Sequence, residues 1–178
     1  MKSKNVHEYI KKVAFLIRKE RERKDISILY MTDRLHLSDS YYRHLERATT
    51  QQVSLYKYLQ MAQLIRIPLS EVLEYVETKN VNMKKETYKL GYSKLQENFD
   101  IDSYIKEIGE ELRRRRKEQN KYQKTFGDAM GITSHYYGHI ERGTQMSISL
   151  YKYKVIADIL DTPLHIILRQ VEENLNIK

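Results

Sequence analysis

The strongest constraint on the fold of this chain is an internal repeat. A shift of 95 residues aligns residues 40–73 with residues 135–168 without a gap, and the correspondence extends over 7–76 against 102–171. The string Ser-Leu-Tyr-Lys-Tyr occurs at 54–58 and again at 149–153, and Pro68 aligns with Pro163. The sequence therefore predicts two modules of one kind: a first copy at 1–77, a linker at 78–100 and a second copy at 101–178.

Each copy has the pattern of five short helices. Apolar residues recur at helical spacing between Tyr104 and Leu112, and Gly131 is placed to end the next helix. Hydroxyl side chains precede the apolar runs, as N-caps do. We expect these caps at Ser27, Ser38 and Ser54 in the first copy and at Thr133 and Ser149 in the second. The predicted fold is all-α: two repeated five-helix domains joined by a linker that is partly helical around 83–97.

Composition excludes several classes of protein. The chain has no cysteine, which removes disulfides, a catalytic thiol and thiolate zinc sites. No stretch approaches the roughly twenty apolar residues of a membrane span, and the first residues lack the apolar core of a signal peptide. We therefore expect a cytoplasmic protein without membrane contact.

The charge balance favours an anionic partner. The net charge is +8 and the isoelectric point is near 9.4. The excess is spread thinly, however, because residues 7–77 hold 12 basic and 10 acidic side chains and residues 101–173 hold 12 and 11. A nucleic-acid surface would have to arise from sorting these charges onto one face.

Residues 108–144 resemble the Xre/Cro-type helix-turn-helix family, the DNA-binding modules of phage repressors and many bacterial regulators. The matching features are a basic first helix, Gln123 at the start of the second, a small residue at Gly127, Gly131 in the turn, and the Ile-Glu-Arg-Gly string ending at Gly143. The resemblance implies a lambda repressor-like fold that binds double-stranded DNA. The first copy departs from it at four matched positions: Ile28, Thr32, His36 and Ala48.

The resemblance also implies which side chains read DNA. The third helix of each module would enter the major groove and present its outward residues to base edges. With Tyr137 and Ile140 facing inward, the base-facing positions expected in the second copy are Ser134, His135, Gly138 and His139, together with Gln123. Their counterparts in the first copy are Asp39, Ser40, Arg43 and His44. Arg43 suits guanine and Asp39 suits cytosine, so the two modules should prefer different half-sites.

Other matched positions are expected to hold phosphates or to join helices. The phosphate candidates are Tyr41, Arg47 and Thr49 in the first copy and Tyr136, Arg142 and Thr144 in the second. The resemblance implies structural ion pairs between Arg21 and Glu46 and between Arg116 and Glu141. The basic run 113–117 winds around its helix, so both a solvated surface and direct phosphate contact are open to it.

The sequence indicates no enzyme, cofactor, metal site or small-molecule ligand. His135 and His139 are four residues apart on a helix, but no third metal ligand is apparent. The leading prediction is a sequence-specific regulator with two recognition helices in one chain. Two alternatives remain open. One is an interaction protein in which one module dimerises, as in a homodimer, or docks a partner; the other is a DNA-processing accessory factor of a plasmid or phage.

Overall fold

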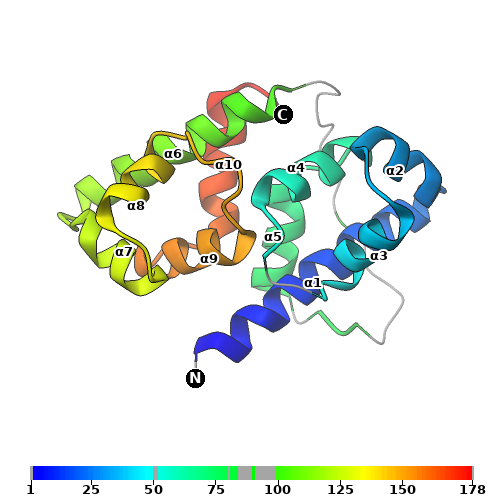
Figure 1. Cartoon of the computed structure of the whole chain (residues 1–178), viewed down its shortest axis with the longest axis horizontal. Coiled ribbons are helices and arrows are strands. Elements are labelled where there is room, and N and C mark those ends of the chain that lie inside the picture. The colour runs from blue at the N-terminus through cyan, green and yellow to red at the C-terminus, as the bar shows by residue number, and fades with distance from the viewer. Residues whose placement is uncertain (1, 50–51, 80, 84–89, 91–98, 178) are drawn as a thin grey trace.

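The computed structural model describes residues 2–49, 52–79, 81–83, 90 and 99–177, and this part of the chain forms ten α-helices and no strand (Figure 1). The first five are α1 (Lys2–Arg23), α2 (Ile28–Leu35), α3 (Asp39–Arg47), α4 (Leu55–Leu64) and α5 (Leu69–Thr78). The others are α6 (Ile101–Glu118), α7 (Gln123–Met130), α8 (Ser134–Glu141), α9 (Leu150–Ile159) and α10 (Leu164–Asn174). None of these helices has the length and apolar character that crossing a membrane requires.

The helix boundaries follow the sequence repeat. The starts of α2, α3, α4 and α5 each lie 95 residues before those of α7, α8, α9 and α10. Each predicted cap hydroxyl accepts a hydrogen bond from a backbone N–H in the first turn of its helix, which confirms the five caps predicted from the sequence. The predicted linker helix at 83–97 falls almost entirely outside the described residues.

The first copy closes two helix ends without glycine. His36 and Ala48 adopt left-handed backbone conformations, with φ of 52° and 47°, where the second copy has Gly131 and Gly143, with φ of 66° and 65°. A left-handed non-glycine residue costs on the order of 1 kcal/mol, which the surrounding packing must offset. The departures at these two positions therefore leave the fold of the first copy intact.

Two glycines in the second copy permit close packing between backbones. A Cβ on Gly109 would lie 2.6 Å from the carbonyl oxygen of Ile140, so α6 and α8 cross almost in backbone contact. A Cβ on Gly127 would lie 2.7 Å from the carbonyl oxygen of Ile132, within the turn between α7 and α8. These contacts fix the position of α8 relative to the helices behind it.

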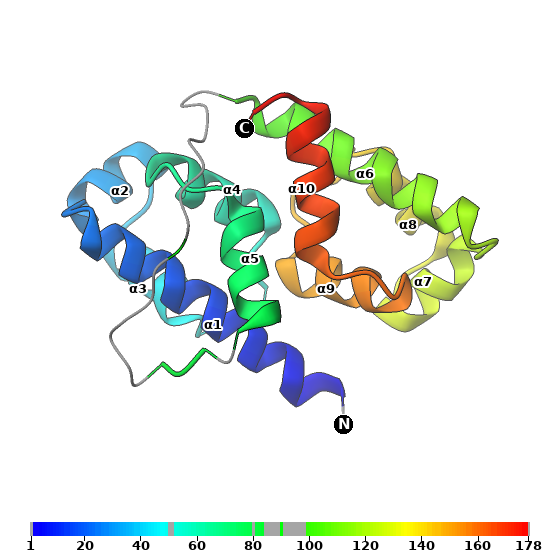
Figure 2. The ribbon, with the colours of Figure 1, turned by 180° about the vertical axis from the view of Figure 1, so that it is seen from behind.

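The two groups of helices meet along a central interface in which α5 packs against α10, α9 packs against α1 and α4, and α4 also packs against α6 (Figure 2). Ser54 and Ser149 form an isolated antiparallel bridge. The Leu55 N–H donates to the Ile148 carbonyl at 2.9 Å, and the Leu150 N–H donates to the Val53 carbonyl at 3.1 Å. The 95-residue shift converts each of these hydrogen bonds into the other, and it maps Ser54 onto Ser149, so the interface has an approximate two-fold axis.

Carboxylates complete the same reciprocal pattern. The Glu77 carboxylate accepts from the backbone N–H of His165 at 3.0 Å, and the Glu172 carboxylate accepts from the backbone N–H of Ser70 at 3.3 Å. Each carboxylate also accepts from a tyrosine hydroxyl of its own helix group, Tyr9 for Glu77 and Tyr104 for Glu172. The arrangement places α3 and α8 on one face of the molecule, with α1 and α6 behind them (Figures 1 and 2).

Candidate nucleic-acid interface

The outer face of α8 carries small and polar side chains. Tyr137 and Ile140 are fully buried, and the Tyr137 ring stacks on Phe126 with centroids 4.7 Å apart. Ser134 and His135 are exposed and His139 is half-buried, as their predicted outward positions require. Gly138 differs from the prediction because it is buried: its α-carbon lies beneath the side chains of Arg142 and Gln123.

A hydrogen-bond network orients the two histidines of α8. His139 Nδ1 lies 3.1 Å from Thr144 Oγ1, and this hydroxyl donates to the His139 carbonyl. Because the hydroxyl donates to that carbonyl, the tautomer with its proton on Nδ1 lets His139 donate to Thr144 Oγ1 and makes its Nε2 an acceptor. That Nε2 lies 3.1 Å from the Nε2 of His135. On the outer face of the helix, His139 Nε2 therefore contacts His135 and must release this contact before it accepts from DNA.

The pKa of the His139 imidazole is lowered by desolvation first and then by electrostatic repulsion from Arg142 and His135. The lowered pKa favours the neutral ring, which an accepting Nε2 requires. Two histidines do not make a metal site, and within the described residues no cluster of three or more His, Asp or Glu side chains is placed to hold a metal ion.

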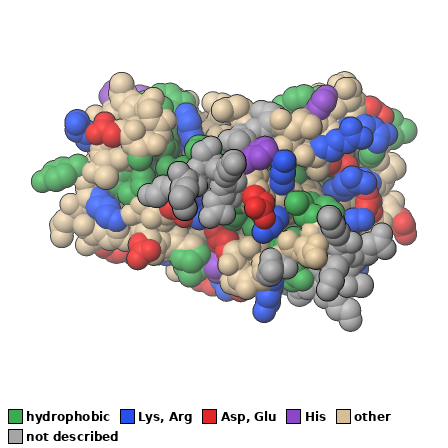
Figure 3. Space-filling view, turned by 90° about the horizontal axis from the view of Figure 1, so that it is seen from below, with side chains coloured by type: hydrophobic (Ala, Val, Ile, Leu, Met, Phe, Trp, Pro, Cys, Tyr) green, Lys and Arg blue, Asp and Glu red, His purple; other side chains and the backbone are tan. Residues whose placement is uncertain are grey.

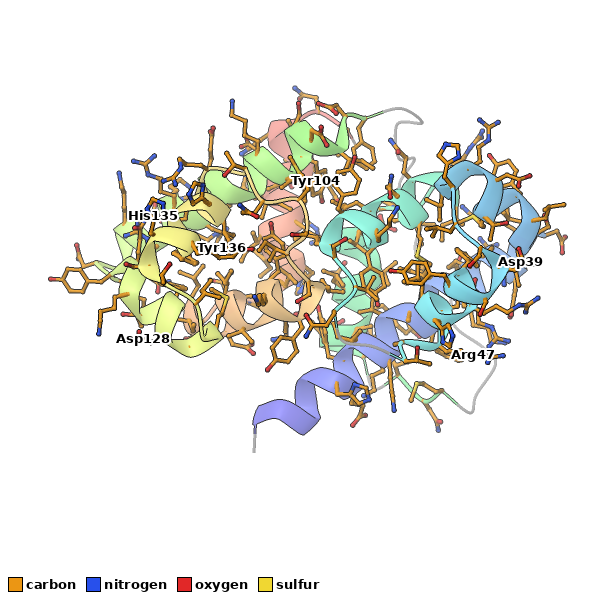
Figure 4. All side chains as sticks on the ribbon, viewed as in Figure 1. Asp39, Arg47, Tyr104, Asp128, His135 and Tyr136 are labelled. Carbon is orange, nitrogen blue, oxygen red and sulfur yellow. The ribbon has the colours of Figure 1, made fainter. Side chains whose placement is uncertain are left out.

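The outer face of α3 is more strongly charged. Asp39, Ser40, Arg43 and His44 are all exposed, in agreement with their predicted orientation. Figure 4 shows Asp39 at the start of α3. His44 Nδ1 lies 3.1 Å from Thr49 Oγ1, the same contact that orients His139 in the second copy. Arg43 occupies the position equivalent to Gly138, so a guanidinium group lies where the second copy has no side chain.

Buried ion pairs anchor both of these helices. Arg116 Nε lies 2.5 Å from Glu141 Oε1, its Nη2 lies 3.0 Å from Oε2, and its Nη1 donates to the Lys121 carbonyl. In the first copy, Arg21 contacts Glu46 in the same bidentate way at 2.6 and 3.2 Å. These pairs connect the first helix of each group to the helix that carries the candidate reading residues.

Gln123 has a different environment from the one predicted. Its side-chain amide donates to Glu141 Oε2 at 2.8 Å and lies against Gly138. The amide therefore supports the Arg116–Glu141 pair in the unbound protein. Its counterpart in the first copy, Ile28, cannot make this hydrogen bond.

The predicted phosphate-binding residues surround the two helices. Tyr41, Arg47 and Thr49 are exposed beside α3, and Arg142 and Thr144 are exposed beside α8. Tyr136 is half-buried, and its hydroxyl lies 3.4 Å from Gln145 Oε1. Thr49 and Thr144 hold the histidine rings, so their hydroxyls already have partners before any phosphate arrives.

The side chains of the basic run 113–117 differ in whether they pair with nearby carboxylates. Arg114 pairs with Glu111 and Glu118, and Arg115 pairs with Glu111, whereas Arg113 and Lys117 are exposed. Most of the arginines in this run therefore carry local partners. The other end of the molecule, formed by α1–α3, also has basic side chains interspersed with acidic ones (Figure 3).

Residues 112–167 match the model of one protein family, described as Helix-turn-helix. The matched segment begins in α6, includes all of α7, α8 and α9, and ends within α10. It contains the α7–α8 pair with its turn at Gly131, so this part of the chain is similar to a helix-turn-helix domain, and the match supports DNA binding. No curated protein and no solved structure matches the chain significantly.

Sequence reasoning missed the residues of the central interface. Glu77 and Glu172 align under the 95-residue shift, as do Glu74 and Arg169, and these four side chains all contact the opposite helix group. The signal lay in the repeat itself, because a residue that packs across a two-fold axis has its counterpart at the equivalent position.

Proposed function

We propose that this protein is a sequence-specific double-stranded DNA-binding regulator of transcription that uses two recognition helices, α3 and α8, from one chain. In this proposal residues 1–77 and 101–178 are two domains of the same kind, and residues 78–100 connect them. The helix-turn-helix match over 112–167 supports the DNA-binding role of the second domain.

The observation that carries the two-helix proposal is the reciprocal hydrogen bonding of the central interface. Repressors of the helix-turn-helix class read two half-sites through a two-fold dimer, with recognition helices in successive major grooves about 34 Å apart. In this chain, Leu55 and Leu150 exchange backbone hydrogen bonds with Ile148 and Val53 about an approximate two-fold axis. In this proposal a single chain supplies the arrangement for which an ordinary repressor needs two.

The two half-sites in this proposal are unequal. Arg43 offers a fork of donors that suits the O6 and N7 atoms of guanine, whereas the equivalent Gly138 offers no side chain. His139 and His44 are held alike by threonine hydroxyls, and an accepting Nε2 suits the amino groups of adenine or cytosine. The sequence read should therefore be asymmetric.

One observation favours the alternative in which the first domain docks a protein partner. Leu29 is 65% exposed and Tyr30 is 43% exposed on α2, in the copy that departs from the family pattern. Scattered surface hydrophobes are ordinary, so this observation carries less weight than the exposed polar face of α3. A plasmid or phage accessory role would use the same DNA contacts at a different locus.

The proposal is tested by measuring the affinity of the full chain for duplex DNA as a function of salt. If about six or more phosphates are contacted, log K should fall against log salt with a slope near −5 or steeper, at about −0.9 per contact. Arg47→Ala and Arg142→Ala should each make the slope shallower by roughly one contact. A flat salt response would refute DNA binding, and footprinting across the native locus separates a promoter site from an origin or transfer site.

A further inference from the structure

At the central interface an acidic residue meets a basic one. Glu74 on α5 forms an ion pair with Arg169 on α10. These two positions are 95 residues apart, so they are equivalent in the repeat. A residue that faces its own equivalent lies next to the approximate two-fold axis, and in a symmetric dimer of like domains the same side chain would occupy both places.

The backbone contacts of the interface do not distinguish like domains from unlike ones. Its backbone hydrogen bonds need only main-chain groups, which every pairing supplies. Glu77 and Glu172 are both glutamates, and each accepts from a backbone N–H at the opposite helix start. Two first domains, or two second domains, could therefore form all of these contacts. Some neighbouring side chains do change with the pairing: His165 bonds Glu77 where Ser70 bonds Glu172, and Lys154 lies 4.0 Å from Glu77 where the first copy has Leu59. The position next to the axis differs from these because there a like pairing brings two like charges together.

We propose that Glu74 and Arg169 form a charge code that selects the pairing of a first domain with a second domain and disfavours pairing between like domains. Two first domains would place Glu74 against Glu74, and two second domains would place Arg169 against Arg169. Each like pairing replaces an attraction with a repulsion, whereas the unlike pairing alone satisfies both charges.

The code deepens the proposed function, and it rests on the proposed pairing of two domains. It keeps one α3 and one α8 together in a fixed order, so that one chain reads one asymmetric site in one orientation. A chain without the code could associate through like domains and bind a palindrome as a two-chain complex. The inferred preferred state is therefore a single chain whose first and second domains form the central interface with each other.

The first experiment is a double-mutant cycle on the full chain without DNA. Glu74→Arg and Arg169→Glu each place like charges next to the axis, and the exchanged variant E74R/R169E restores the attraction. Because both side chains are more than a third exposed, with 37% and 39% of their surface accessible, we expect a coupling of roughly two- to fivefold in the unfolding equilibrium constant. Additive effects, with no recovery in the exchanged variant, would overturn the charge code.

The second experiment uses disulfide trapping, for which the cysteine-free chain gives a clean background. In the bridge between Ser54 and Ser149 the two residues form a non-hydrogen-bonded antiparallel pair, whose Cα atoms lie about 4.5 Å apart, within disulfide range. Oxidised S54C/S149C should therefore form an intrachain bond and remain a single chain on a non-reducing gel. If it instead yields crosslinked chains, the proposed domain pairing is wrong.

The S54C variant alone reports on pairing between first domains of two chains. With the natural charges it should give little covalent dimer. A mixture of S54C/E74R chains with S54C/R169E chains has like charges within each chain and opposite charges between chains, so covalent dimer should rise several-fold over either chain alone. Equal yields would overturn the code while leaving the intrachain pairing and DNA binding intact.

Discussion

Removal of the Glu141 carboxylate tests how the structure holds its candidate reading helix. Glu141 is 2% exposed, and it accepts two hydrogen bonds from Arg116 and one from Gln123. In Glu141→Ala the Arg116 guanidinium, which is only 11% exposed, keeps its charge but loses its counterion. Breaking a buried pair on one side costs about 3–5 kcal/mol, because the remaining charge is desolvated and unpaired.

We expect a loss near the lower end of that range, about 3 kcal/mol, because Arg116 retains its hydrogen bond to the Lys121 carbonyl. For a chain of this length that loss corresponds to a decrease in Tm of roughly 6–12 °C. Thermal unfolding followed by circular dichroism measures it directly. The matched control is Glu118→Ala, because Glu118 pairs with Arg114 but is 57% exposed, and its loss should stay within about 0.5 kcal/mol.

The two copies provide an internal comparison. Glu46 pairs with Arg21 in the same bidentate geometry but has Ile28 in place of the supporting Gln123. Glu46→Ala should therefore destabilise the protein as well, by less than Glu141→Ala. If Glu141→Ala melts within a degree of Glu118→Ala, the reasoning that assigns the pair a buried structural role is refuted.

Three further predictions concern the same elements. Gly109→Ala should destabilise the protein by about 1–3 kcal/mol, because the added Cβ would meet the Ile140 carbonyl and this outweighs the better helix propensity of alanine. A chemical denaturation curve that shows stabilisation would contradict this prediction. Arg43→Ala should relax base preference at one half-site by about 1–3 kcal/mol, measured by competition between duplexes; an unchanged ranking would remove Arg43 as a reader. The affinity for DNA should fall as the pH is lowered below about 6.5, because protonation of His139, whose pKa is lowered from that ordinary value, removes the accepting Nε2 that the proposed base contact needs. His139→Ala should weaken this dependence, and an identical profile would refute it.

The helix plan was predictable from the sequence because local signals determine it. Ser27 and Thr133 cap their helices as the pattern of hydroxyls before apolar runs indicated. The orientation of α8 followed from the burial of Tyr137 and Ile140, since a helix that buries one face must expose the other.

The features that the sequence did not predict depend on contacts between side chains in the folded protein. Gly138 is on the outward side by spacing but is covered by Arg142 and Gln123, whose directions no periodicity reveals. Predicting the Glu74–Arg169 contact likewise requires knowing that α5 packs against α10. The spacing of residues within either helix does not identify the helix that packs against it. The two histidines of α8 were visible as a pair, but the threonine that orients His139 was visible only in the folded loop.

The central claim is that α3 and α8 read one asymmetric DNA site together. The most direct measurement is selection of bound sequences from a random duplex library by the full chain, run in parallel with Arg43→Ala. We predict an enriched motif with two unequal half-sites about one helical turn apart, in which Arg43→Ala loses preference at one half-site only. Enrichment of a single half-site that Arg43→Ala leaves unchanged, or the absence of any enriched duplex, would contradict the account.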